Sequence, residues 1–142
     1  MVAPKRRFEQ IVFALKRDFE RIHIAQEIPL SEAKPSKGKP GVYMLFFEGN
    51  LQYVGSSKNL YERIRSNLLS GNEKSHTLIN KLCKLRENWD KHKARRFLKS
   101  SAKIKFIEVD SVEKAKILED ILIAVYKPYY NKSLKQLLKE KQ

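Results

Sequence analysis

Glu119 is the residue whose type and position point most directly to chemistry. At about 100° per residue, the last long predicted helix surrounds Glu119 with apolar neighbours such as Leu122 and Ile123. Such a carboxylate must be paired, protonated or bound to a metal, because burying an isolated charge is costly. Two interpretations follow. The first is a partly exposed helix edge or an ion pair with a lysine or arginine of the basic stretch 56–105. The second is a metal-ligating acid that shares Mg²⁺ with phosphate oxygens and waters.

Two tyrosines ten residues apart form a second candidate group. Tyr43 and Tyr53 lie in PGVYMLFFEGNLQYVG, whose two apolar runs flank the turn residues 48–50 and predict a β-hairpin. Arg63 follows ten residues after Tyr53. Tyrosine is common in strands, so both tyrosines alone have a structural interpretation. Their spacing with Arg63, together with Glu119, favours a functional site.

The pattern as a whole resembles the GIY-YIG nuclease superfamily. Its elements are GVY at 41–43, YVG at 53–55, Arg63 in KNLYERIR, Glu119, and Asn131 in KPYYN. The resemblance covers residues 38–132, and it is specific because five elements keep their order and spacing. Some relatives, such as the nucleotide-excision-repair endonuclease domain, have lysine directly after the second motif, whereas this chain has Ser56. Other relatives, including homing endonucleases, also have serine there. We expect a stand-alone, single-domain member.

The resemblance implies hydrolysis of a DNA phosphodiester with one divalent metal ion, Mg²⁺ or Mn²⁺. Glu119 would bind the metal, Tyr43 would orient or deprotonate the attacking water, and Arg63 would hold a phosphate oxygen. Tyr53 would form a hydrogen bond within the site. The candidate substrate-binding residues are Lys58, Arg65 and His76, and the motif positions with a structural role are Gly41, Gly55 and Asn131.

His76 resembles a histidine found near this point in several family members, where it would contact a phosphate or assist proton transfer. A lone histidine at the start of a helix is more often a surface residue. Both interpretations of His76 stay open.

The chain divides into three predicted parts. Residues 1–37 contain an amphipathic helix over 8–28 and a linker with several prolines. Residues 38–132 form the GIY-YIG-like domain, and residues 133–142 form a basic tail with a short helix. The N-terminal helix could pack on the domain, dimerise or contact a partner.

Within the domain, the apolar patterns predict a small α+β fold. The hairpin strands are 41–47 and 51–54, and a third strand is 103–109. Asn59 and Glu62 open a helix that Gly71 or Asn72 can end, a second helix starts near Ser75, and a third runs from Asp110 to about Tyr126. The result is a three-stranded, partly antiparallel sheet flanked by helices.

Charge and cysteine content favour a nucleic-acid partner inside a reducing compartment. The formal net charge is +14, of which +10 lies in residues 56–105. Such a basic block is typical of proteins that bind the DNA backbone, although a merely basic surface would look similar. The single cysteine, Cys83, excludes an internal disulfide and predicts a cytoplasmic protein. The apolar run 11–15 is too short for a signal peptide or a membrane span.

Two functions therefore compete. The first is a metal-dependent endonuclease that cuts double-stranded or structured DNA, and the second is a non-cleaving DNA- or RNA-binding module with the same fold. The sequence leaves the substrate and the pathway open, among repair, recombination, restriction and mobile-element roles.

Overall fold

The structure is a computed structural model that describes residues 2–69 and 76–141. Its centre is a four-stranded sheet with the order β1-β4-β2-β3, in which every neighbouring pair is antiparallel. The strands are β1 (Ile28–Pro29), β2 (Gly41–Phe47), β3 (Asn50–Ser57) and β4 (Lys103–Glu108). The predicted α+β fold and its three main strands are confirmed, and β1 is an added edge strand.

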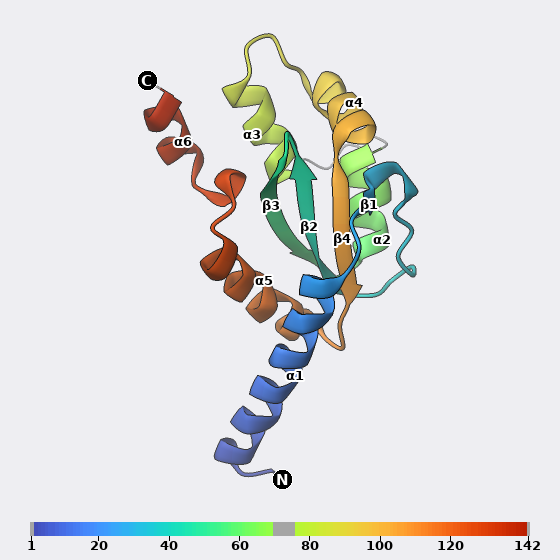
Figure 1. Ribbon diagram of the computed structural model, residues 1–142, viewed down its shortest axis with the longest axis vertical. Helices are drawn as coiled ribbons and strands as arrows, with labels where there is room; N and C mark the ends of the chain where they lie inside the picture. Colours follow the sequence, from blue (N-terminus) through green and yellow to red (C-terminus); the bar gives the residue numbers. More distant parts are fainter. Residues whose placement is uncertain (1, 70–75, 142) are drawn as a thin grey trace.

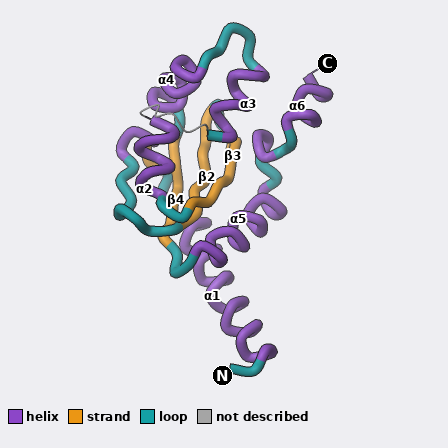
Figure 2. Tube along the Cα trace, turned by 180° about the vertical axis from the view of Figure 1, so that it is seen from behind, coloured by secondary structure: helices purple, strands orange, loops and turns teal. Residues whose placement is uncertain are grey.

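Helices lie around this sheet, as Figures 1 and 2 show from opposite sides. A short helical turn, α2 (Leu60–Glu62), continues directly into the π-helical η2 (Arg63–Leu69). The longer helices are α1 (Pro4–Ile24), α3 (Thr77–Leu85), α4 (Lys91–Ser101), α5 (Val112–Tyr126) and α6 (Leu134–Lys141). Two short 3₁₀ turns, η1 (Leu30–Glu32) and η3 (Tyr129–Asn131), complete the described chain.

The sheet separates two apolar cores. Alternate side chains of β2 point to opposite faces, so Leu45 packs with Leu60 and Ile79, while Met44 packs with Ile22 and Leu122. The first core joins the sheet to α2, η2, α3 and α4, and the second joins it to α1 and α5. The N-terminal end of α1 projects away from the sheet (Figure 1).

A tight turn joins the two hairpin strands. Glu48 and Gly49 both have positive φ, 54° and 81°, as expected for a two-residue hairpin turn. Asn50, which the sequence places in the turn, already pairs with Phe47 as the first residue of β3. The hairpin prediction is confirmed, with a turn shorter by one residue.

The N-terminal segment differs from its prediction in two respects. The helix runs from Pro4 to Ile24 rather than over 8–28, and the expected linker is partly packed. Leu30 and Ala33 are fully buried, and the Leu30 N–H donates to the Ala102 carbonyl at 2.9 Å. This segment is therefore docked along the β4 edge.

The basic stretch after α3 forms a separate helix, α4, which the apolar pattern does not reveal. Asn88 takes a left-handed conformation with φ 65°, and Asp90 caps α4 by accepting a hydrogen bond from the Lys93 N–H at 2.7 Å. The expected helix boundaries at Gly71, Asn72 and Ser75 lie outside the described residues.

Two further boundaries test the predicted caps. Asn59 accepts a hydrogen bond from the Glu62 N–H at 3.2 Å, which confirms the start of α2. The cap of α5 is Ser111, whose hydroxyl accepts from the Lys114 N–H at 3.2 Å, rather than the neighbouring Asp110. Within the described residues, no helix is long and apolar enough to span a membrane.

Candidate active site

Side chains from five elements meet in a cavity of about 210 Å³ at the β3 edge of the sheet. Most of the predicted site residues contribute to its wall. They come from β2, β3, η2, α3 and α5, with His76 as the N-cap of α3, and the lining residues are Tyr43, Tyr53, Gly55, Ser56, Arg63, His76, Thr77, Lys116 and Glu119.

The hairpin register puts both tyrosines on one face of the sheet. Tyr53 is paired with Leu45, which lies two residues after Tyr43 on β2 and therefore on the same face. The ring centroids of Tyr43 and Tyr53 are 6.3 Å apart. Ten residues of spacing thus place two phenols side by side at the wall of the cavity.

Two glycines allow this close packing. Tyr43 is paired with Gly55, and a Cβ at Gly55 would overlap the Tyr43 hydroxyl. A Cβ at Gly41 would overlap both the Ile107 carbonyl and the Leu60 side chain. Only glycine leaves room at either position, because the overlapping atoms include backbone and a fully buried ring.

His76 lies beneath Tyr43 rather than on the surface. Its side chain is 1% exposed, and its Nε2 is 2.6 Å from the Tyr43 hydroxyl oxygen. Its Nδ1 accepts a hydrogen bond from the Leu78 N–H at 3.0 Å, so His76 also caps α3. Burial, with Arg63 and Arg95 nearby, lowers the pKa of His76 to about 3. The surface interpretation of His76 is therefore wrong.

These contacts fix the tautomer of His76. A neutral imidazole has one donor and one acceptor nitrogen, and Nδ1 is the acceptor because it receives the Leu78 N–H. Nε2 therefore bears the hydrogen and donates it to the Tyr43 oxygen. The hydroxyl hydrogen of Tyr43 stays free for another acceptor.

Both tyrosines are neutral phenols at ordinary pH. Burial is the main reason that the pKa of Tyr43 lies well above 10, with a further rise from Tyr53 and an opposing effect of Arg63. Burial and then Glu119 raise the pKa of Tyr53 to about 12. Neither phenol is a ready base in this form.

Arg63 stands where the α2 turn passes into the π-helical η2. Such changes of helix type are frequent at functional sites. The Arg63 side chain is half-buried and lines the 210 Å³ cavity. It also lines an adjoining cavity of about 640 Å³.

Glu119 reaches the cavity from α5 over the end of β3. Its side chain is 13% exposed. Its Oε1 accepts a hydrogen bond from the Ser56 hydroxyl at 2.8 Å and from the Lys116 ammonium at 3.0 Å. Glu119 therefore has an ion pair, but its partner lies on α5 itself and not in the basic stretch 56–105, and Glu119 also lies at the cavity wall.

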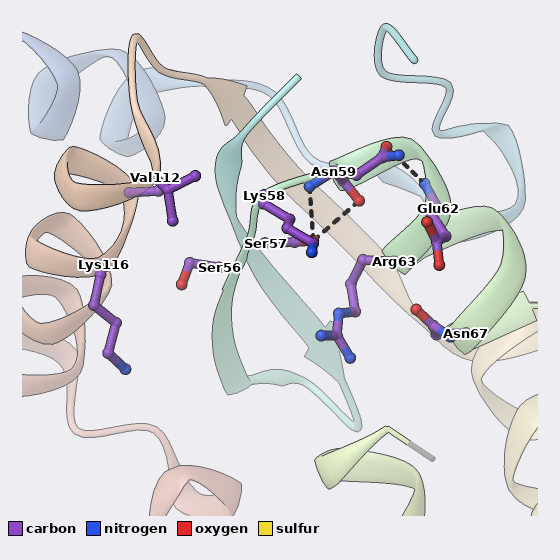
Figure 3. Close-up of a pocket in the computed structure, with 10 residues that line it drawn as sticks. Ser56, Ser57, Lys58, Asn59, Glu62, Arg63, Asn67, Val112 and Lys116 are labelled. Atoms are coloured by element: carbon purple, nitrogen blue, oxygen red, sulfur yellow. Dashed lines mark hydrogen bonds between the residues drawn. The ribbon is translucent and has the colours of Figure 1, made fainter. Parts of the chain in front are cut away.

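The larger cavity is a basic hollow between β3, α2 and α5. Figure 3 shows Lys116 on α5 across Ser56 from Lys58 and Arg63. These three cations line the hollow together with Glu62 and several neutral residues. Its charge and its continuity with the smaller cavity suit a phosphate backbone.

Three predicted residues, Asn131, Arg65 and the motif glycine Gly41, line neither cavity. Asn131 pairs with the free edge of β3, where it accepts from the Val54 N–H at 2.7 Å and donates to the Val54 carbonyl at 2.8 Å. Arg65 points the other way and donates to the Ser31 carbonyl at 2.9 Å. Arg65 thus holds the N-terminal segment rather than the hollow.

The residues present fit a single-carboxylate magnesium site. Among the described residues, no group of three or more His, Cys, Asp or Glu could hold a metal alone. Mg²⁺ commonly takes one or two carboxylates and completes its shell with waters and substrate phosphates. Glu119 at the wall of a basic hollow meets that requirement.

Sequence reasoning missed Lys116 and Thr77 as lining residues. Lys116 lies on the exposed side of α5, but its place one turn before Glu119 was a usable signal. Thr77 offered no such signal beyond following His76.

Comparison with known proteins identifies the family of the chain. The family model of the GIY-YIG catalytic domain matches residues 39–133. UvrABC system protein C of Bacteroides thetaiotaomicron is 37% identical over 100 residues, which are 68% of this chain and 13% of that protein. The protein of the same name from Lactobacillus delbrueckii is 32% identical over 113 residues, 79% of this chain and 16% of the relative. The chain thus spans less than a fifth of these relatives.

Among solved structures, the N-terminal GIY-YIG endonuclease domain of UvrC from Thermotoga maritima, bound to magnesium, is 25% identical. The match covers 80% of this chain and 93% of that domain, with a TM-score of 0.45. The family model spans well over half of the chain. On that ground the chain belongs to the GIY-YIG catalytic domain family, within the GIY-YIG nuclease superfamily that its motifs predict.

Proposed function

We propose that the protein is a divalent-metal-dependent endonuclease that hydrolyses phosphodiester bonds of double-stranded or structured DNA. The observation that supports this most is the meeting of Tyr43, Arg63 and Glu119 at one cavity that adjoins a basic hollow. A water orienter, a phosphate ligand and a metal ligand are what such a hydrolysis requires.

The chain's own residues have distinct tasks in this proposal. Tyr43 uses its free hydroxyl hydrogen and its lone pairs to orient the attacking water, because His76 already donates to its oxygen. Arg63 binds a non-bridging phosphate oxygen, where a permanent planar cation stabilises the charge that develops. Tyr53 packs beside the ring of Tyr43 at the wall of the cavity and holds that ring in place.

Glu119 would hold the metal through its carboxylate at the cavity wall. Bound there, Mg²⁺ or Mn²⁺ would polarise the phosphate and stabilise the leaving 3′-oxygen. The solved Thermotoga domain binds magnesium as its catalytic divalent cation.

DNA would bind through its backbone. The cations Lys58, Arg63 and Lys116 line the hollow, and α4 adds exposed Lys91, Lys93 and Arg96. Lysine and arginine contacts to phosphates position DNA without reading its sequence. We place this activity in the cytoplasm because the one cysteine is a free thiol.

A cleavage assay with a matched control tests the function. Supercoiled plasmid and flap DNA would be incubated with Mg²⁺ or Mn²⁺ and with the wild type, Glu119→Gln or Glu113→Gln. Glu113 is an exposed acid on the same helix, away from both cavities. We expect cleavage by the wild type and by Glu113→Gln, and a loss of at least about 100-fold in Glu119→Gln.

The competing function, a non-cleaving DNA- or RNA-binding module, gives a different result. It predicts salt-dependent binding, with log K falling by about 0.9 per phosphate contact on duplex DNA, and no turnover by any variant. Equal cleavage by the wild type and Glu119→Gln would show that the assigned site is wrong. A panel of linear duplex, flap, Holliday junction and single strand would then define the substrate.

A further inference from the structure

Lys116 makes a contact that the roles described so far do not use. Its ammonium is 3.0 Å from Glu119 Oε1 and 3.7 Å from Asp120 Oδ1, yet its side chain is 65% exposed. It lines both the 210 Å³ cavity and the 640 Å³ hollow. Lys116 thus stands at the border of two spaces, with its charge against the carboxylate that the proposed function gives to a metal.

The ion pair with Glu119 is easily broken. Lys116 precedes Glu119 by three residues on α5, and a lysine N-terminal to its acid is the weaker order for a helical pair. Only Glu119 is largely buried, at 13% exposed, whereas the Lys116 side chain is 65% exposed, so water screens the ammonium and ordering the long lysine side chain costs rotamer freedom. A divalent ion at the same oxygen would displace the ammonium at little cost.

The hollow offers the displaced ammonium a second place. Lys116 faces Lys58 and Arg63 across Ser56 (Figure 3). Like charges around an empty hollow repel, whereas a DNA phosphate between them would attract all three. Four rotatable bonds let the lysine side chain change from one space to the other without backbone movement.

Lys114 shows what an ordinary lysine of this helix does. Its ammonium binds Asp110 at 3.2 Å and closes the first turn of α5. Lys114 is not part of the wall of either cavity. The two lysines lie on the same helix, carry the same charge, and each pairs with an acid. They differ because the acid of Lys116 lies at the candidate site and the acid of Lys114 does not.

We propose that Lys116 is an exchangeable cation of the active site: it neutralises Glu119 while no divalent ion is bound, and it moves to a DNA phosphate in the hollow when the metal takes Oε1. This rests on the proposed function, because it needs Glu119 as the metal ligand. The exchange keeps the carboxylate neutralised in both states. It also adds a phosphate contact only after the metal is in place.

Metal titration of the DNA-free protein is the first test. Mn²⁺ binding would be measured by electron paramagnetic resonance of the free ion for the wild type, Lys116→Gln and Lys114→Gln. Loss of the competing ammonium should tighten Mn²⁺ binding about three- to tenfold in Lys116→Gln, and Lys114→Gln should match the wild type. Unchanged or weaker Mn²⁺ binding in Lys116→Gln would overturn the exchange.

DNA affinity with and without a divalent ion is the second test. A short duplex would be titrated in EDTA and in Ca²⁺, which also takes oxygen ligands, with gels to check that the duplex stays intact. In EDTA, Lys116→Gln should bind as the wild type does. In Ca²⁺ it should bind about three- to tenfold more weakly, with a salt slope smaller by about 0.9.

Other outcomes separate this inference from the proposed function. An equal loss of DNA affinity in EDTA and in Ca²⁺ would make Lys116 an ordinary surface contact and reject the exchange. Cleavage that needs Glu119, with no effect of Lys116 on metal or DNA binding, would reject the exchange and keep the function. Tighter Mn²⁺ binding in Lys116→Gln without cleavage by the wild type would keep the exchange at Glu119 and reject the nuclease. Matching thermal unfolding of the lysine variants checks that each is folded.

Discussion

The two faces of β2 are buried alike and do different things. Tyr43 and Met44 are neighbours in the chain, and each is 1% exposed. Met44 points into an apolar core with Val54 and Leu122, whereas Tyr43 points to the cavity and bonds to His76 at 2.6 Å. Burial therefore does not identify the site. What identifies it is a polar atom that reaches a cavity wall together with other polar atoms.

The polar face tolerates burial because its deepest groups are neutral. Desolvation raises the pKa of Tyr43 and lowers the pKa of His76, so neither is charged at neutral pH. The charged members, Arg63 and Glu119, are only partly buried and lie where solvent or substrate can reach them. Because the fully buried groups are neutral and the charged groups are only partly buried, the site avoids the cost of an unpaired buried charge.

Removing one oxygen atom from the polar face should have the largest expected effect, which is on the rate of cleavage. Tyr43→Phe keeps the ring and loses the hydroxyl that would orient the water, so we expect cleavage to fall about 10²- to 10⁴-fold. Stability should fall by only about 1 kcal/mol, because His76 loses its acceptor while the packing remains. Single-turnover cleavage and urea unfolding measure the two effects, and a rate within a factor of three of the wild type would remove Tyr43 from the chemistry.

A substitution on the apolar face should have the opposite result, a large loss of stability and little loss of cleavage. Met44→Ala deletes a fully buried side chain and should lower the free energy of unfolding by about 3 kcal/mol. Cleavage per folded molecule should stay within about twofold, since Met44 lines neither cavity. Urea unfolding and a rate corrected for the folded fraction test this. A large rate loss in the folded protein would mean that the two faces are coupled through β2.

The sequence alone predicts the features of the polar face that depend on local geometry. The ten-residue spacing of Tyr43 and Tyr53 follows from a short hairpin, because pairing across a tight turn fixes which residues share a face. The position of Glu119 among apolar neighbours follows from helical periodicity. The family membership, the α+β fold and the main strands follow from the same signals.

Contacts that depend on tertiary packing could not be predicted from the sequence. His76 bonds to Tyr43 across 33 residues of sequence, and only the docking of α3 reveals it. Arg65 fits a phosphate contact by type and position, but packing turns it toward Ser31. The helix α4 is too basic for its apolar stripe to stand out, and β1 is only two residues long. Periodicity describes one element at a time, whereas these features depend on pairs of elements.

The burial of His76 gives the polar face a dependence on pH that the apolar face lacks. With a pKa of about 3 in the folded protein and about 6.5 when unfolded, His76 stays neutral in the fold while the unfolded chain takes up a proton. Its contribution to stability is therefore complete above pH 6.5 and is lost as the pH falls toward 3. The slope approaches about 1.4 kcal/mol per pH unit, or about 2 kcal/mol by pH 5.

Two variants, His76→Asn and Met44→Ala, test this dependence of stability on pH. His76→Asn keeps a side-chain acceptor for the Leu78 N–H and does not titrate, so the free energy of unfolding should lose about 2 kcal/mol less between pH 7 and pH 5 than in the wild type. Met44→Ala should shift the whole curve and leave its slope unchanged, because methionine binds no proton. Urea unfolding at pH 5, 6 and 7 measures the slopes. Equal slopes for the wild type and His76→Asn would mean that His76 takes up its proton in the fold as it does in the unfolded chain, which contradicts a neutral ring whose Nδ1 accepts the Leu78 N–H.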